Sequence, residues 1–191
     1  MTDRINEFET DAAIFKFLAA FYSVNPSEEI LQAARELSET VEGDELQDCI
    51  DNLRRGENIL ELKQDWTKLF RGVSPEYGPT PPYEQLYTGE DLLALLKELA
   101  QSYTEAGFDA SGERQDYIGT ELAFLSFLAA EAAKALRNGD EALAEEYAER
   151  FESFFTAHPG RWFPAFRKTA ASHASTGFYK GAMALTEFSL T

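Results

Sequence analysis

Few side chains in this sequence could catalyse a reaction or bind a metal ion. The chain has two histidines, His158 and His173, and a single cysteine, Cys49. A di-metal centre in a helical bundle needs a Glu-x-x-His pair on each of two helices, whereas Phe155 and Ala170 stand three residues before the histidines. A zinc site made from the cysteine and both histidines lacks a recognisable ligand spacing. The pattern excludes di-metal carboxylate chemistry and gives little support to a zinc site.

Sequence signatures of nucleotide and acyl chemistry are missing as well. The chain contains no GxxxxGK[ST] loop, no GxGxxG and no GxSxG. We interpret both histidines as helix-end or surface residues and Cys49 as a buried, inert thiol, because free cysteines are commonly buried. We expect a protein that is not an enzyme and needs no metal or cofactor. An active site of scattered carboxylates stays open as the alternative.

The charge balance narrows the class of partner. The chain has 34 acidic and 17 basic residues, giving a net charge of −17. Residues 1–65 carry −10, 66–110 carry −4, 111–152 carry −6 and 153–191 carry +3. A general nucleic-acid binder is excluded because phosphate binding needs a basic surface. An acidic protein favours cationic partners.

Composition predicts an all-α fold. Alanine and leucine supply 47 residues, whereas valine and isoleucine supply 9; strands favour β-branched residues and helices favour Ala and Leu. A chain of 191 residues is typical of one domain, since domains contain about 100–200 residues. We therefore expect a single-domain bundle over residues 1–191, with roughly eight to ten helices of ordinary length.

Apolar residues at three- and four-residue spacing predict where these helices lie. The first is expected to begin near Thr10 or Asp11, the second to be capped by Asn25, and the fifth to be capped by Thr88. The long helix from Asp116 to Leu136 is apolar around much of its circumference, which places it at the centre of the bundle. The remaining helices are expected around Ile50, over 59–70 before a Gly72 cap, from 143 to His158, over 164–174 and over 177–190.

The longest irregular segment, residues 72–87, reads GVSPEYGPTPPYEQLY. Its four prolines and two glycines disfavour regular helix, and its tyrosines argue against disorder. Loops of this length within a domain are usually functional. Together with the end of the Trp66 helix and with Asp116, the segment forms a candidate binding surface. Apolar side chains surrounded by acidic ones suit a peptide that has both basic and apolar parts. Its members are Trp66, Leu69, Phe70, Pro81, Pro82, Tyr83, Glu84, Tyr87 and Asp116. Ordinary core residues and helix caps remain the alternative reading.

Three segments in order along the chain carry a family pattern. They are Asp65-Trp66-Thr67-Lys68-Leu69-Phe70-Arg71-Gly72 followed by Pro81-Pro82-Tyr83-Glu84 and Tyr87; Glu105-Ala106-Gly107-Phe108 followed by Asp116-Tyr117-Ile118-Gly119-Thr120-Glu121-Leu122-Ala123-Phe124-Leu125; and His158, Trp162, Pro164, Phe178 and Tyr179. Together they resemble the TorD/DmsD/NarJ family of redox-enzyme maturation chaperones. Two positions depart from the family pattern: Tyr117 stands where many members have histidine, and Gln115 where they have proline.

The resemblance implies an all-helical chaperone for a molybdenum-cofactor oxidoreductase. It would bind the twin-arginine leader of the catalytic subunit, or the apo-subunit itself, until cofactor insertion and folding are complete. Carried over from the family, the leader-binding residues are Trp66, Leu69, Phe70, Pro81, Pro82, Tyr83, Asp116 and Tyr117. The protein would act as a monomer or as a dimer that exchanges a segment through one of the long loops.

Two other functions are kept as alternatives. One is a NarJ-like assembly factor for a reductase that is not exported, and the other is a small helical nucleotide-binding protein or enzyme. The N-terminal sequence MTDRINEFETDAA has acids where a signal peptide needs bases, and no run approaches the ~18 apolar residues that span a membrane. We therefore expect a cytoplasmic protein that does not insert into a membrane.

Overall fold

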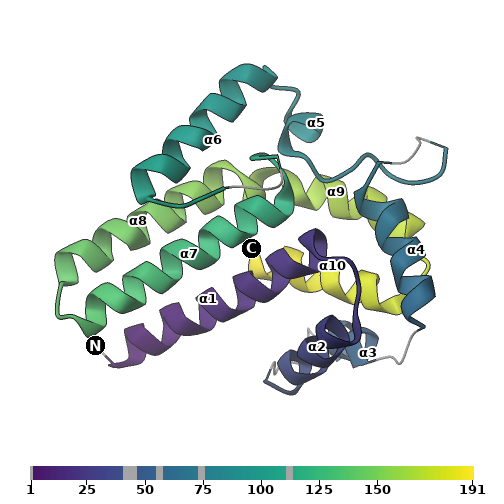
Figure 1. The fold of residues 1–191 in the computed structure, drawn as a ribbon, viewed down its shortest axis with the longest axis horizontal. Helices are drawn as coiled ribbons and strands as arrows, with labels where there is room; N and C mark the ends of the chain where they lie inside the picture. Colours follow the sequence, from purple (N-terminus) through teal and green to yellow (C-terminus); the bar gives the residue numbers. More distant parts are fainter. Residues whose placement is uncertain (1, 41–46, 55–57, 73–75, 111–113) are drawn as a thin grey trace.

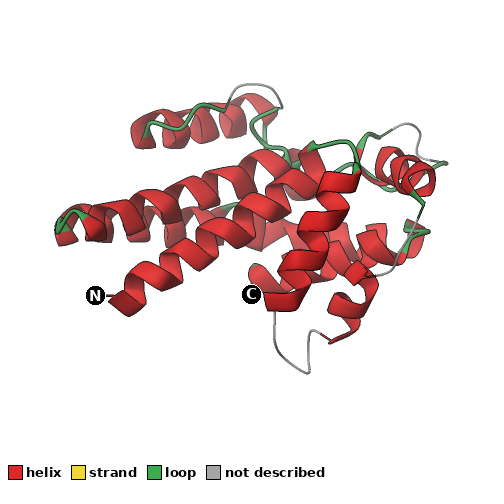
Figure 2. Ribbon diagram, turned by 60° about the horizontal axis from the view of Figure 1, so that its bottom comes forward, coloured by secondary structure: helices red, strands yellow, loops and turns green. Residues whose placement is uncertain are grey.

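The computed structural model describes residues 2–40, 47–54, 58–72, 76–110 and 114–191. These residues form helices joined by loops, and an isolated bridge is the only β-type pairing among them (Figures 1 and 2). The all-α prediction is confirmed. The helices are α1 (Thr2–Ser23), α2 (Glu28–Thr40), α3 (Gln47–Arg54), α4 (Ile59–Phe70), α5 (Glu84–Thr88), α6 (Leu92–Ala106), α7 (Ile118–Arg137), α8 (Glu141–Ala157), α9 (Pro159–His173) and α10 (Gly177–Ser189).

Helix α7 forms the centre of one layer, as its apolar sequence predicts. It packs between α1 and α8, which lie along its two sides (Figure 1). Leu122, Leu125 and Leu128 are fully buried, and the hydroxyl of Ser126 donates a hydrogen bond to the Ala12 carbonyl of α1 at 2.7 Å. The central helix thereby fixes the two flanking helices.

A second part of the core is aromatic and lies among α1, α4, α9 and α10. The Tyr22 ring of α1 contacts Phe70 of α4 at 5.1 Å and Phe163 of α9 at 6.0 Å between ring centroids. Phe70 also packs edge-on against Tyr179 of α10 at 5.2 Å. Because edge-to-face packing is favourable beyond the area that it buries, these rings connect the ends of four helices.

Helix α6 stands apart from the rest of the bundle (Figure 1). Its inward face, including Leu95 and Leu99, is buried, and its Tyr103 ring lies 4.7 Å from Phe124 of α7. The Tyr103 hydroxyl donates to the Gln115 carbonyl at 2.8 Å. The helix is therefore attached both through the leucines of its inward face and through an aromatic side chain near its C-terminal end.

Several predicted helix starts are wrong. Helix α1 begins at Thr2, not near Thr10 or Asp11, because Ile5 and Phe8 pack against a small separate cluster at the far end of α7 and α8. Helix α9 begins at Pro159 rather than Pro164, since proline suits the first turn of a helix, where its missing N–H costs nothing.

Two predicted caps are also corrected. The α2 helix is capped by the Ser27 hydroxyl, which accepts from the Ile30 amide at 3.4 Å, and not by Asn25. Helix α6 is capped by Asp91, which accepts from the Ala94 amide at 2.9 Å, and not by Thr88. In each case the capping oxygen accepts a hydrogen bond from the amide three residues later, which is the usual geometry of an N-cap.

The irregular segment 72–87 and Cys49 give mixed outcomes. Gly72 has φ +60°, as a residue following a helix end requires. Contrary to the expectation of no helix, the segment runs into α5, which begins at Glu84. Cys49 is half-buried rather than buried, and burial raises the pKa of its thiol. Gly43, the expected break after the second helix, lies outside the described residues.

Candidate functional site

The predicted peptide-binding residues converge where α5 meets the start of α7. Tyr83 and Tyr117 form an antiparallel bridge, in which the Glu84 amide donates to the Asp116 carbonyl at 2.8 Å and the Ile118 amide donates to the Pro82 carbonyl at 3.0 Å. The structure thereby joins two motif segments that are separated by α6. We call this region the α5–α7 junction.

The tryptophan motif on α4 belongs to the core. Leu69 and Phe70 are fully buried, and Trp66 is 6% exposed. The Trp66 indole donates to the Tyr22 carbonyl at 3.2 Å, while the guanidinium of Arg71 covers the ring at 4.6 Å. These side chains support the junction from beneath.

Tyr117 is a buried structural residue in this chain. Its hydroxyl donates to the same Tyr22 carbonyl, at 2.7 Å, and its ring lies 5.2 Å from that of Tyr83. Trp66 and Tyr117 thus meet on one carbonyl oxygen of α1. The hydroxyl of Tyr117 is a neutral hydrogen-bond donor at the position where many relatives in the resembled family carry histidine.

Asp116 is fully buried and binds a guanidinium of its own chain. Arg114 donates to its two carboxylate oxygens at 2.5 and 2.6 Å, and the same guanidinium lies 4.2 Å from the centre of the Tyr83 ring. The bond to Asp116 is the main reason that the pKa of Arg114 is raised. Asp116 is not the N-cap of α7; that position is held by Tyr117.

Glu84 is fully buried at the first turn of α5. One carboxylate oxygen accepts from Arg161 of α9 at 2.7 Å, and the other lies 2.9 Å from Nδ1 of His158. Arg161 also donates to Glu90 at 2.9 Å, which raises the pKa of its guanidinium. The Glu84 carboxylate thus connects α5 to the start of α9.

A third buried carboxyl, Glu121 on α7, completes the group. It accepts from the Trp162 indole at 3.0 Å. Burial raises its pKa well above the usual value, and the neighbouring Glu84 carboxylate adds to the effect. Tyr87 stacks on the other side of the junction against the Trp162 ring, with 5.5 Å between centroids. Glu84, Asp116 and Glu121 form what we call the buried acid cluster.

The surface over the junction is less acidic than the sequence suggests. Glu84 and Asp116 were expected at an acidic rim, but both are buried and already paired with arginines. Tyr83 and Pro81 are partly exposed, and Pro81 lines a hollow of about 410 Å³ with Pro79 and the end of α9. The open part of the junction is therefore proline-rich and apolar.

The sequence interpretation did not assign site roles to Glu121, His158, Arg161 and Trp162. Three of these residues, Glu121, His158 and Trp162, already stood in the family pattern, and they come from two of its separate segments. The sequence signal that could have found them is their place in or next to the same family pattern as Glu84. A buried carboxylate needs cationic or hydrogen-bonding partners, so a search of that pattern for basic side chains and indoles would have identified these residues.

Three findings limit the chemistry of the molecule. In the described parts of the chain, no three His, Cys, Asp or Glu side chains are grouped to hold a metal ion. Among the same residues, no helix has the length and apolar character required to cross a membrane. His173 lies at the end of α9, where its Nδ1 is 3.0 Å from the Thr169 carbonyl, and it lines the hollow at Pro81.

Comparison with known families identifies the chain. No curated protein matches it significantly. The profile of the nitrate reductase delta subunit family matches residues 27–168, a region that contains the whole α5–α7 junction and most of α9. Since this is well over half of the 191 residues, the chain belongs to the nitrate reductase delta subunit family, the NarJ-type chaperones for maturation of molybdenum-containing redox enzymes.

Proposed function

We propose that the protein is a cytoplasmic chaperone that binds the twin-arginine leader, and the apo form, of a molybdoenzyme catalytic subunit. It holds the subunit until cofactor insertion and folding are complete. The observation that carries the proposal is the family match over residues 27–168. The net charge of −17 supports a basic peptide as partner, because complementary charge steers association.

The α5–α7 junction suits the apolar part of such a leader. Pro81 lines the hollow beside α9, and Tyr83, two residues later, is also partly exposed. Prolines hold an extended loop that binds with little loss of conformational freedom. Pro82, Tyr87 and Tyr117 fix this loop, and Trp66, Leu69 and Phe70 support it from the core. Glu84 and Asp116 act through the arginines that they position.

Calorimetric titration with a twin-arginine leader peptide tests the proposal. The probe is a synthetic peptide in which two adjacent arginines precede a run of apolar residues, and the reference is a scrambled peptide of the same composition. We expect the leader to bind at least about tenfold more tightly, a difference of about 1.4 kcal/mol. Equal affinities for the two peptides would rule out leader recognition.

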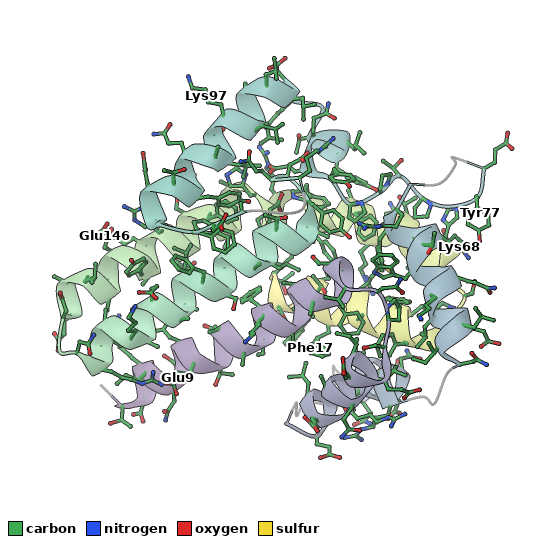
Figure 3. The ribbon with its side chains drawn as sticks, viewed as in Figure 1. Glu9, Phe17, Lys68, Tyr77, Lys97 and Glu146 are labelled. Carbon is green, nitrogen blue, oxygen red and sulfur yellow. The ribbon has the colours of Figure 1, made fainter. Side chains whose placement is uncertain are left out.

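A pair of tyrosine variants tests the junction itself. Tyr83→Ala removes a partly exposed ring at the junction, and we expect it to weaken leader binding about tenfold, as truncation of an aromatic anchor commonly does. Tyr77→Ala is the matched control, since Tyr77 is half-exposed in the same loop (Figure 3). Similar affinities of the two variants would show that the leader binds elsewhere.

A second candidate function is assembly of a reductase that stays in the cytoplasm. It is favoured by the matched family itself, which is described by the delta subunit of nitrate reductase. Such a factor would bind a vestigial leader or the catalytic subunit directly. Co-purification from native cytosol separates the candidates by whether the captured catalytic subunit carries a twin-arginine leader.

A further inference from the structure

A groove of about 470 Å³ lies between α6 and α8, apart from the hollow at Pro81. Side chains of α6 form one wall of it and side chains of α8 the other. Its floor contains the rings of Phe124 and Phe154 together with the imidazole of His158. Figure 3 shows Glu146 on α8 beside the C-terminal end of α6, whereas Lys97 of α6 points away from α8.

Acceptor groups dominate the walls of the groove. Four glutamates line it, Glu98, Glu105, Glu146 and Glu149, against a single arginine. Arg150 pairs with Glu146 at 2.9 Å. No hydrogen bond or ion pair shorter than 4.0 Å engages the side chains of Glu98 and Glu149 within the described part of the chain. The groove therefore has unused negative charge on both walls.

The floor adds a buried imidazole, one nitrogen of which has no hydrogen bond among the described residues. His158 is 4% exposed, and its Nδ1 lies 2.9 Å from the Glu84 carboxylate. A carboxylate that also accepts from Arg161 can only accept from His158, so Nδ1 carries a proton. The other ring nitrogen, Nε2, belongs to the side chain that lines the groove. The nearest charged oxygen to this Nε2, on Glu98, is 4.0 Å away, beyond hydrogen-bond distance.

We infer that the groove between α6 and α8 binds an arginine side chain of the client leader. The inference rests on the proposed function, and it places the basic part of the leader at a site separate from the proline-rich junction. A guanidinium has only donors, arranged in a plane, and its charge complements the carboxylates of Glu98 and Glu149. The rings of Phe124 and Phe154 on the floor suit the apolar stem of the arginine side chain.

Calorimetry with a matched pair of variants tests the assignment. Glu98→Gln with Glu149→Gln removes both unused charges, while Glu28→Gln with Glu29→Gln removes two exposed charges from α2. Each is titrated with the leader peptide and with a version whose two arginines are glutamines. We expect the groove variant to lose about tenfold in affinity for the arginine peptide alone. The control should lose less than about twofold.

Imidazole NMR gives an independent readout because the chain has only two histidines. Assigned with a His173→Gln variant, the His158 ring signals should shift on addition of the arginine peptide and stay unchanged with the glutamine peptide. His173 lines the hollow at Pro81, so its signals report on the apolar part that both peptides share.

Each failure has a separate meaning. Wild-type-like affinity of the groove variant for the arginine peptide, or an unchanged His158 signal on saturation, would overturn the groove assignment and leave the proposed function standing. Equal binding of the leader and a scrambled peptide by the unmodified protein would overturn both.

Discussion

Glu121 is the residue whose surroundings depart furthest from those of an ordinary glutamate. Its carboxyl is fully buried on the central helix, and burial together with the Glu84 carboxylate raises its pKa well above the usual value of 4.5. The Trp162 indole, which favours the ionised form, opposes this effect only in part. The other oxygen, Oε1, has no hydrogen-bond partner among the described residues. The Glu121 carboxyl therefore stays protonated at pH values at which an exposed glutamate is already ionised.

This burial predicts a pH dependence of stability. Between the unfolded pKa, near 4.5, and the raised folded pKa, the unfolded chain has released a proton that the folded protein retains. Rising pH therefore favours unfolding in this range. We expect Glu121→Gln, which mimics the protonated carboxyl, to remove a slope of up to ~1.4 kcal/mol per pH unit from the free energy of unfolding. Urea denaturation of both proteins from pH 5 to 8 measures this.

The control for that measurement is Glu131→Gln. Glu131 lies on the same helix and pairs with the exposed Lys134 at 2.8 Å, so its loss should leave the pH slope unchanged. Parallel stability curves for the unmodified protein and Glu121→Gln would mean that the carboxyl releases its proton equally in the folded and unfolded chain.

At the scale of elements, α4 and α10 are joined through one buried carboxylate. Asp65 of α4 accepts from the Ser175 amide at 3.0 Å, from the Thr176 amide at 2.8 Å and from the Thr176 hydroxyl at 2.6 Å. These groups immediately precede α10, which has no side-chain cap bond at its own N-cap. Helix starts favour negative charge. Asp65 thus takes the place of a cap, although it comes from a helix far away in the sequence.

Removal of this carboxylate should loosen the contact between α4 and α10. Asp65→Ala leaves two backbone amides without a partner, and we expect a loss of about 3 kcal/mol in the free energy of unfolding. Glu61→Ala, an exposed change one turn earlier on α4, should alter stability by less than about 0.5 kcal/mol. Chemical denaturation measures both. An effect of Asp65→Ala as small as that of the control would show that water replaces the carboxylate.

How far the sequence predicts the structure differs between elements. The centre of α7 follows from local apolar periodicity, because so much of its circumference is buried. Starts and caps depend on distant contacts: Ile5 and Phe8 extend α1 because a cluster on α7 and α8 receives them. The site shows the same limit, since the family pattern identifies Glu84 but does not reveal that Arg161 and His158 bury it.

At the scale of the whole molecule, charge is uneven along the chain. Residues 1–152 carry −20, whereas residues 153–191, which form the end of α8, α9 and α10, carry +3. The acidic α8 lies toward one end of the molecule and the acidic α2 toward the other (Figure 1), so negative charge is present at both ends. A field of this kind acts over the Debye length, about 10 Å at 0.1 M salt. It therefore affects the approach of a basic peptide before any contact forms.

Approach and retention should consequently respond differently to salt. Raising the salt from about 50 to 300 mM screens the field, and we expect the association rate of the leader peptide to fall about tenfold. The dissociation rate depends on contacts already formed and should change less than about twofold. Stopped-flow fluorescence with a labelled peptide measures both rates.

The groove variant Glu98→Gln with Glu149→Gln should raise the dissociation rate. The control Glu28→Gln with Glu29→Gln, on α2 and far from the groove, should only lower the association rate slightly. If salt instead acted on dissociation alone, the acidic surface would have no part in attracting the leader, and the charge of the chain would serve only its local ion pairs.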